Sequence, residues 1–113
     1  MIPHRREKLA SLIQKELGEI IIKEIEFPTG SLVTISEVEV SGDLKTAIIW
    51  VSVIPGEASD EVLEILKRAR GFLQYHLGEE VRARIVPRIG FALDCGAEHA
   101  ARIEKISLEE KDK

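Results

Sequence analysis

Three arginines near the end of the sequence have the spacing of a phosphate-binding row. Arg82, Arg84 and Arg88 stand an even number of residues apart, with apolar residues between them. In a β-strand, side chains two residues apart point to the same face and lie roughly 6.6 Å from each other. Such a row of guanidinium groups can follow a nucleic-acid backbone, which proteins bind mainly through Lys and Arg contacts to phosphates. The spacing therefore predicts a phosphate-binding strand face, the alternative being an ordinary solvated one.

Two further groups of cations extend this prediction. Arg5, Arg6 and Lys8 fall in the first turns of an expected helix, where the positive end of the helix dipole disfavours cations. A sequence that breaks this local rule favours a negatively charged partner. The remaining candidates flank an expected helix break or follow a hairpin turn; they are Lys67, Arg68, Arg70 and Lys45.

The net charge of the chain, −4 at pH 7, hides this grouping. Residues 67–88 contain six cations and two carboxylates, and residues 4–8 contain three cations and one carboxylate. The rest of the chain is therefore strongly acidic. This asymmetry predicts one basic face and an acidic back.

Metal and enzyme chemistry find little support in the sequence. Asp94, Cys95 and His99 are the side chains of metal ligands and lie close together, but a closed zinc site needs four ligands. A catalytic thiol needs a base and an oxyanion site, and no Gly-rich phosphate loop or nucleophile elbow is visible. We therefore expect no enzyme, no metal site and no cofactor.

The single tryptophan, Trp50, has two possible roles. Strand alternation puts it on the face opposite to Ala47, Ile49 and Val51, where its ring could stack on an RNA base. More often such a ring covers neighbouring aliphatic side chains. Phe27 is expected to pack in the same way, as a plug in the loop after the first helix.

Hydrophobic periodicity predicts the elements that position these residues. In order, they are a helix over residues 4–25, strands at 32–40 and 45–54, a helical stripe over 59–77, a third strand at 81–93 and a short helix over 97–107. The strand that returns through the helices should cross over right-handed, which leaves the helices on one face of a three-stranded sheet. The predicted fold class is α+β.

Three irregularities are expected within these elements. The apolar phase of the first strand shifts between Ile35 and Val38, which predicts a bulge near residues 36–37. Pro87 removes a ladder donor, so the third strand should lie at a sheet edge or carry a bulge. Gly71 predicts a kink where two helices meet, and a β-branched residue there should crowd the turn, so that Gly71→Val destabilises the protein more than Arg70→Ala.

Length and composition limit the class of protein. A chain of 113 residues, 44% of them hydrophobic, fits a single domain over residues 1–113, with 109–113 as a frayed tail. No run approaches the roughly 20 apolar residues of a membrane helix. The lone Cys95 cannot form an internal disulfide, which fits a reducing compartment. We expect a cytoplasmic monomer.

Several motifs together resemble the bacterial ribosome-binding factor A family. They lie in the family's order and at the family's spacing over about residues 4–108. The first are Arg5-Arg6 with residues 13–17, and the hairpin segment at 38–47 with 50–53. The others are residues 68–73, and residues 82–87 with 91–94. One departure is that Phe27-Pro28-Thr29 stands where the family usually has Asp-Pro-Arg, so the proline turn is kept and the arginine is absent.

The resemblance implies a type II K-homology (KH) fold in which an Ala-x-Gly helix kink, here Ala69 and Gly71, replaces the usual Gly-x-x-Gly loop. It also implies binding to the immature small (30S) ribosomal subunit and its 16S rRNA during late maturation, including 5′-end processing and growth in the cold. Two alternatives stay open. One is a BolA-like iron–sulfur adaptor that shares this fold, and the other is a generic single-stranded RNA-binding module.

Overall fold

The computed structural model describes residues 5–81 and 86–94. Its elements are, in order, helix α1 (Arg5–Glu24), strands β1 (Leu32–Val40) and β2 (Thr46–Ile54), the 3₁₀ turn η1 (Gly56–Ala58), helices α2 (Ser59–Arg68) and α3 (Arg70–Glu80), and strand β3 (Arg88–Leu93). The helix expected over residues 97–107 and the tail at 109–113 lie outside the described residues.

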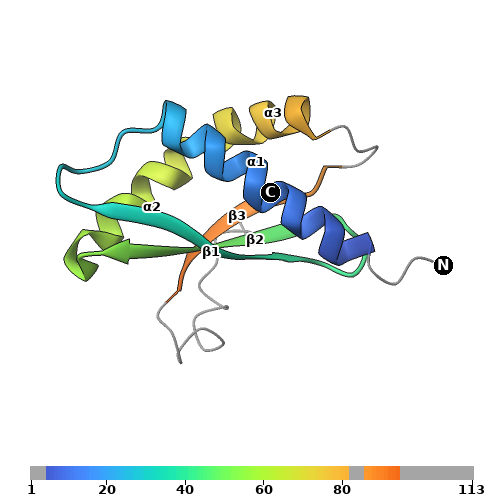
Figure 1. Cartoon of the computed structure of the whole chain (residues 1–113), viewed down its shortest axis with the longest axis horizontal. Coiled ribbons are helices and arrows are strands. Elements are labelled where there is room, and N and C mark those ends of the chain that lie inside the picture. Colours follow the sequence, from blue (N-terminus) through green and yellow to red (C-terminus); the bar gives the residue numbers. More distant parts are fainter. Residues whose placement is uncertain (1–4, 82–85, 95–113) are drawn as a thin grey trace.

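The described elements form two layers. The sheet has the order β1-β2-β3, with β1 antiparallel and β3 parallel to β2. Helices α1, α2 and α3 all lie over one face of the sheet (Figure 1). The parallel pair requires a long crossover, which α2 and α3 provide. The predicted two-layer α+β arrangement is therefore confirmed.

The main core lies between the sheet and the helices. Alternation along β2 turns Ala47, Ile49 and Val51 toward the helix layer, where all three are fully buried. The helices contribute apolar side chains spaced three and four residues apart, and these buried residues are Ile13, Leu17, Ile21, Val62, Leu66, Leu73 and Leu77. Phe27 packs against this cluster, as expected for a plug.

The predicted bulge is present in β1. Ile35 pairs with Val51 and Glu37 pairs with Trp50, so Ser36 is the extra residue. The bulge restores the apolar phase, because Val33 and Ile35 before it and Val38 after it all contact the main core. The phase shift in the sequence thus has its predicted cause.

Strand β3 is shorter than the sequence predicts. It begins at Arg88, directly after Pro87, because proline has no N–H to donate to the ladder. Val81 is buried but belongs to the end of α3, where its N–H donates to the Leu77 carbonyl at 2.8 Å. Of the two predicted alternatives, a sheet edge or a bulge, the structure has the first, since β3 is the last strand of the sheet.

Trp50 does not have the exposure that a base-stacking role requires. Its side chain is fully buried and packs with Ala92 on the sheet face away from the main core. Its indole Nε1 donates a hydrogen bond of 3.0 Å to Oε1 of Glu39. Because no ring face meets solvent, the stacking alternative is wrong and the packing alternative holds.

The predicted kink lies at Ala69. Helix α2 ends at Arg68 and α3 begins at Arg70, while Ala69 between them has φ −87° and ψ 1°. Ala69 is half-buried against the core. Gly71 is exposed in the first turn of α3, and a Cβ atom there would have no atom within 4 Å. The crowding expected for Gly71→Val is therefore absent.

The structure reverses the expected order of Gly71→Val and Arg70→Ala, because a side chain at residue 71 meets no crowding and valine is no worse a helix former than glycine. Alanine at the same position gives the clearest test. Gly71→Ala should stabilise the protein by up to about 1 kcal/mol, because alanine is the better helix former. Arg70→Ala should cost about 0.5–1.5 kcal/mol, because it removes a hydrogen bond from Arg70 Nη1 to the Ile89 carbonyl. Thermal melts of both variants measure the difference. A melting temperature of Gly71→Ala below that of the wild type would show that the kink needs glycine.

Candidate RNA-binding surface

The hairpin turn between β1 and β2 fixes the place of Lys45. The Ser41 hydroxyl donates to Oδ1 of Asp43 at 2.7 Å, and the same carboxylate oxygen accepts from the Lys45 backbone N–H at 3.1 Å. Leu44 adopts φ 65°, a strained conformation for a residue with a side chain, while its side chain packs on the core. The turn is thus held by hydrogen bonds on one side and apolar contact on the other, and the Lys45 side chain is exposed.

These hydrogen bonds give the turn a pH dependence. The Ser41 hydroxyl, and next the Lys45 N–H, lower the pKa of Asp43 below its ordinary value of 3.8. A carboxylate with a lower pKa in the folded than in the unfolded protein stabilises the fold above the unfolded pKa, and this contribution is lost as the pH falls through the folded value.

We therefore expect Asp43→Ala to melt at a lower temperature than the wild type at neutral pH, because the turn loses its acceptor. The difference should shrink as the pH falls below the ordinary value of 3.8 and through the lowered pKa of Asp43, where the wild-type carboxyl takes up its proton. Melting curves of both proteins across this range are the measurement. A difference that is independent of pH would mean that the charge of Asp43 does not hold the turn.

Arg88 lies next to Lys45. The Arg88 backbone N–H donates to the Lys45 carbonyl at 2.9 Å, and the register pairs Arg88 with Thr46. The side chain of Arg88 is exposed, whereas that of Ile89 is buried in the core. Arg88 therefore points away from the helix layer, as predicted from strand alternation. Arg82 and Arg84, which were predicted to share this face, lie outside the described residues.

The first turn of α1 lies beside the same hairpin turn. An Arg6 guanidinium nitrogen is 3.6 Å from the position that a Cβ atom would take on Gly42. Arg5 and Lys8 are exposed on the same helix start. The beginning of α1, the hairpin turn and the beginning of β3 meet at one end of the molecule, on the right in Figure 1.

The three cations at the kink differ from one another. Lys67 and Arg68 are exposed at the end of α2, where Arg68 Nε lies 3.5 Å from the Glu64 carboxylate. Arg70 is half-buried, and its Nη1 donates to the Ile89 carbonyl at 3.3 Å. A guanidinium has five N–H donors, so this bond leaves Arg70 able to contact a phosphate. The same bond brings Arg70 next to Arg88 in space.

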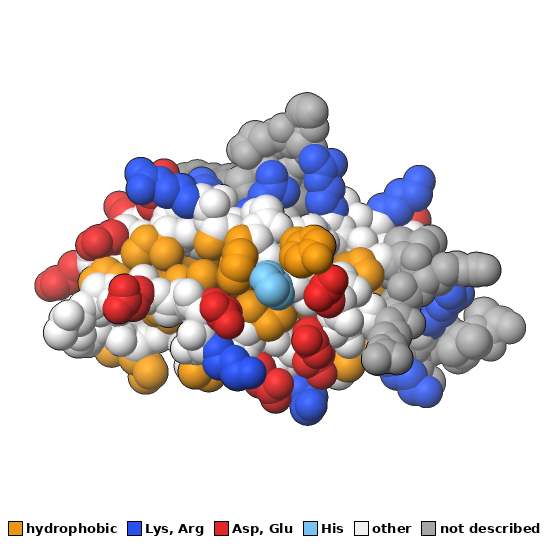
Figure 2. All heavy atoms as spheres, turned by 90° about the horizontal axis from the view of Figure 1, so that it is seen from above, with side chains coloured by type: hydrophobic (Ala, Val, Ile, Leu, Met, Phe, Trp, Pro, Cys, Tyr) orange, Lys and Arg blue, Asp and Glu red, His pale blue; other side chains and the backbone are white. Residues whose placement is uncertain are grey.

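The candidate cations among the described residues thus lie on segments that contact one another, from the start of α1 to the kink. We call this set of cations the basic surface; it consists of Arg5, Arg6, Lys8, Lys45, Arg88, Arg70, Arg68 and Lys67. Seen from the helix side, Lys and Arg side chains gather along the upper edge and at the right-hand end of the molecule (Figure 2). The sequence predicted the members, but not that the hairpin turn and β3 connect them.

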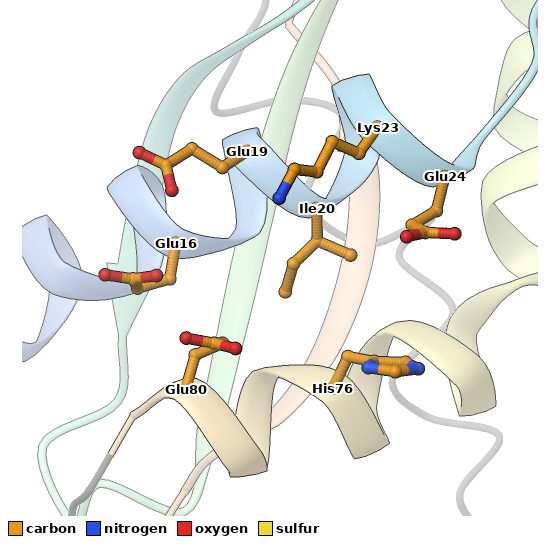
Figure 3. Close-up of a pocket in the computed structure, with 7 residues that line it drawn as sticks. All are labelled: Glu16, Glu19, Ile20, Lys23, Glu24, His76 and Glu80. Carbon is orange, nitrogen blue, oxygen red and sulfur yellow. The ribbon is translucent and has the colours of Figure 1, made fainter.

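The middle of the helix layer is acidic. A groove between α1 and α3 is lined by Glu16, Glu19, Ile20, Lys23, Glu24, His76 and Glu80. Figure 3 shows Glu16 on α1 and Glu80 on α3 on facing sides of this groove. Four carboxylates repel phosphate over a Debye length of roughly 8–10 Å. The acidic back predicted from the charge distribution therefore includes the exposed middle of the helix layer.

Among the described residues we find neither a cluster of metal ligands nor a helix that could span a membrane. They contain no group of three or more His, Cys, Asp or Glu side chains placed to hold a metal ion. Asp94 lies 2.6 Å from the Ser36 hydroxyl, while Cys95 and His99 lie outside the described residues. None of the described helices combines the length and the apolar composition of a membrane span.

Comparisons with known proteins agree on one family. A family model described as ribosome-binding factor A matches residues 5–107. A protein named ribosome-binding factor A from Desulfitobacterium hafniense is 36% identical over 118 residues, which cover 99% of this chain and 94% of that protein.

A crystal structure and a fitted homology model of ribosome-binding factor A are also similar to this chain. The crystal structure of ribosome-binding factor A from Thermus thermophilus has a TM-score of 0.68 and 26% identity, and the match covers 78% of this chain and 94% of the other. A homology model of the Thermus thermophilus factor, fitted into a cryo-EM map of a 30S–RbfA complex, has a TM-score of 0.64 and 29% identity, covering 74% and 88%. Such structures have a KH-like fold, so the predicted fold class is confirmed.

Proposed function

Because this chain belongs to the ribosome-binding factor A family, we propose that it is an assembly factor that binds the immature 30S ribosomal subunit through its 16S rRNA. The observation that carries the proposal is the basic surface, in which the start of α1 meets the hairpin turn, the hairpin turn meets β3, and β3 meets the kinked start of α3. The fitted model of the Thermus thermophilus relative in a 30S complex supports the choice of partner.

The proposed contact residues are those of the basic surface together with Arg82 and Arg84. The exposed Lys and Arg side chains suit phosphate contacts, which give affinity and position but carry no base code. The one tryptophan is buried and unable to stack on a base. Recognition should therefore depend on the shape of the folded rRNA rather than on its sequence.

The charge distribution also orients the protein on the subunit. Phosphates attract the basic surface and repel the acidic groove between α1 and α3. The middle of the helix layer should therefore face away from the rRNA. In this orientation the hairpin turn and the start of β3 approach the rRNA first.

The finer parts of the proposal follow from the family. We propose a non-catalytic, cytoplasmic protein without a cofactor, which acts as a monomer and as one KH-like domain. It assists late maturation of the subunit, including 5′-end processing of 16S rRNA, and matters most in the cold. Depletion in the source organism should raise the fraction of 16S rRNA with unprocessed 5′ ends, most strongly at low temperature, as primer extension would measure.

Competition experiments separate this proposal from the two alternatives. An excess of unrelated single-stranded RNA should leave most of the protein on purified small subunits, because only the subunit presents the correct shape. Complete displacement would favour the generic RNA-binding module. Visible absorbance after mixing with a glutaredoxin and an iron–sulfur donor would favour the BolA-like adaptor, which the family match over residues 5–107 does not support.

A further inference from the structure

A glutamine side chain occupies the outer edge of β3. Strand β3 lies at the sheet edge, so within the described part of the chain the backbone groups on its outer side have no neighbouring strand. Oε1 of Gln74 accepts a hydrogen bond of 2.9 Å from the Ile89 N–H, and Nε2 of Gln74 donates one of 2.8 Å to the Pro87 carbonyl. One amide side chain thus makes both hydrogen bonds that a neighbouring strand would make at this point.

These two bonds flank Arg88. On the inner side of the strand, the N–H of Arg88 itself donates to the Lys45 carbonyl at 2.9 Å. The backbone around Arg88 is therefore held from both sides, by α3 and by Lys45 at the end of the hairpin turn. Arg70, one turn before Gln74 on α3, adds a third bond to the outer edge at the Ile89 carbonyl.

We propose that Gln74 is a positioning residue of the RNA-binding surface. Its amide fixes the backbone of residues 87–89 against α3 and so determines where the Arg88 guanidinium stands relative to Lys45. The same two hydrogen bonds join α3 to β3 at this point. This inference rests on the proposed function. It adds to the proposed contact residues an uncharged side chain that affects RNA binding without contacting phosphate itself.

The structure provides a matched control on the opposite edge of the sheet. Gln14 of α1 donates from Nε2 to the Ile35 carbonyl of the edge strand β1 at 3.1 Å. Both glutamines are half-buried and reach from a helix to the backbone of an edge strand. Gln14, however, lies beside uncharged residues such as Gly18, Ile22 and Thr34, which line the same surface groove.

The test compares Gln74→Leu, Gln14→Leu and Arg88→Ala in binding to purified small subunits at several salt concentrations, with circular dichroism as the folding control. Each lost phosphate contact lowers the slope of log affinity against log salt by roughly 0.7–0.9. Gln74→Leu removes no charge, yet we expect it to lower the slope by about as much as Arg88→Ala. Gln14→Leu should leave the slope unchanged.

The double variant Gln74→Leu/Arg88→Ala isolates the connection between the two residues. Its slope and affinity should equal those of Arg88→Ala alone. An unchanged slope for folded Gln74→Leu, or additive losses in the double variant, would overturn the positioning role. If Arg88→Ala itself binds like the wild type, the proposed contact surface is wrong instead.

A second substitution covers the case in which Gln74→Leu does not fold. Gln74→Glu keeps an acceptor for the Ile89 N–H and loses the donor to the Pro87 carbonyl. We expect the salt slope of Gln74→Glu to lie between the slopes of the wild type and Arg88→Ala. Amide exchange of residues 88–90, measured by NMR, should be faster than in the wild type. Wild-type slope together with that faster exchange would show that the position of the strand does not matter for binding.

Discussion

Substitution of both Lys45 and Arg88 by glutamate is expected to abolish binding to the small ribosomal subunit without unfolding the protein. The two residues are neighbours, since the Arg88 N–H donates to the Lys45 carbonyl, and both side chains are exposed. Exposed substitutions of this kind usually change stability by no more than about 0.5 kcal/mol. Reversing two adjacent charges should replace the two proposed phosphate contacts by two repulsions.

The milder alanine pair allows the residual binding to be measured. Lys45→Ala/Arg88→Ala should lower the slope of log affinity against log salt by about 1.4–1.8, which is two phosphate contacts. The matched control reverses two other exposed lysines, Lys15 and Lys23 of α1, with the same change in net charge. Equal losses in both glutamate pairs would mean that only the total charge matters, and the basic surface would then not be the contact site.

The largest effect on stability is expected for Trp50→Ala. The side chain is fully buried, and replacing a buried Phe or Trp by alanine typically costs about 3–5 kcal/mol. That is a large part of the roughly 5–15 kcal/mol that stabilises a typical domain. Denaturant unfolding should show the loss directly, and a loss below about 1 kcal/mol would contradict the buried position of the ring.

Trp50→Phe separates packing from RNA contact. It keeps an aromatic ring in the same place and loses the hydrogen bond from the indole to Glu39, whose carboxylate is exposed and can bind water instead. We expect a smaller loss of stability and an unchanged affinity for the subunit. A large loss of affinity in a folded Trp50→Phe protein would mean that the indole itself contributes to binding, which would contradict its buried position.

Local signals in the sequence predicted much of the fold. The apolar phase shift before Val38 located the β1 bulge, because a bulge changes which face a side chain meets. Pro87 predicted that β3 would lie at a sheet edge or carry a bulge, because proline cannot donate to a ladder, and the strand lies at the edge. The same proline also marks the true beginning of β3, which periodicity alone placed seven residues too early, at residue 81.

The features that the sequence did not predict depend on contacts between segments that are distant in the chain. Gln74 is an ordinary polar residue on a helix, and no local pattern indicates that its amide reaches Pro87 and Ile89. Arg6 and Gly42 are likewise distant in sequence, and only the packing of α1 on the sheet brings them together. The sequence could thus identify the candidate cations, but it could not predict which of them lie next to one another in the folded protein.

The most direct measurement is co-sedimentation of the protein with immature and with mature small ribosomal subunits, under identical salt conditions. The wild-type protein should bind the immature subunits in a stoichiometric and saturable manner and the mature subunits more weakly, and Lys45→Glu/Arg88→Glu should remain unbound with both. Equal binding of the wild-type protein to both subunits, or to neither, would contradict an assembly factor that recognises the immature subunit.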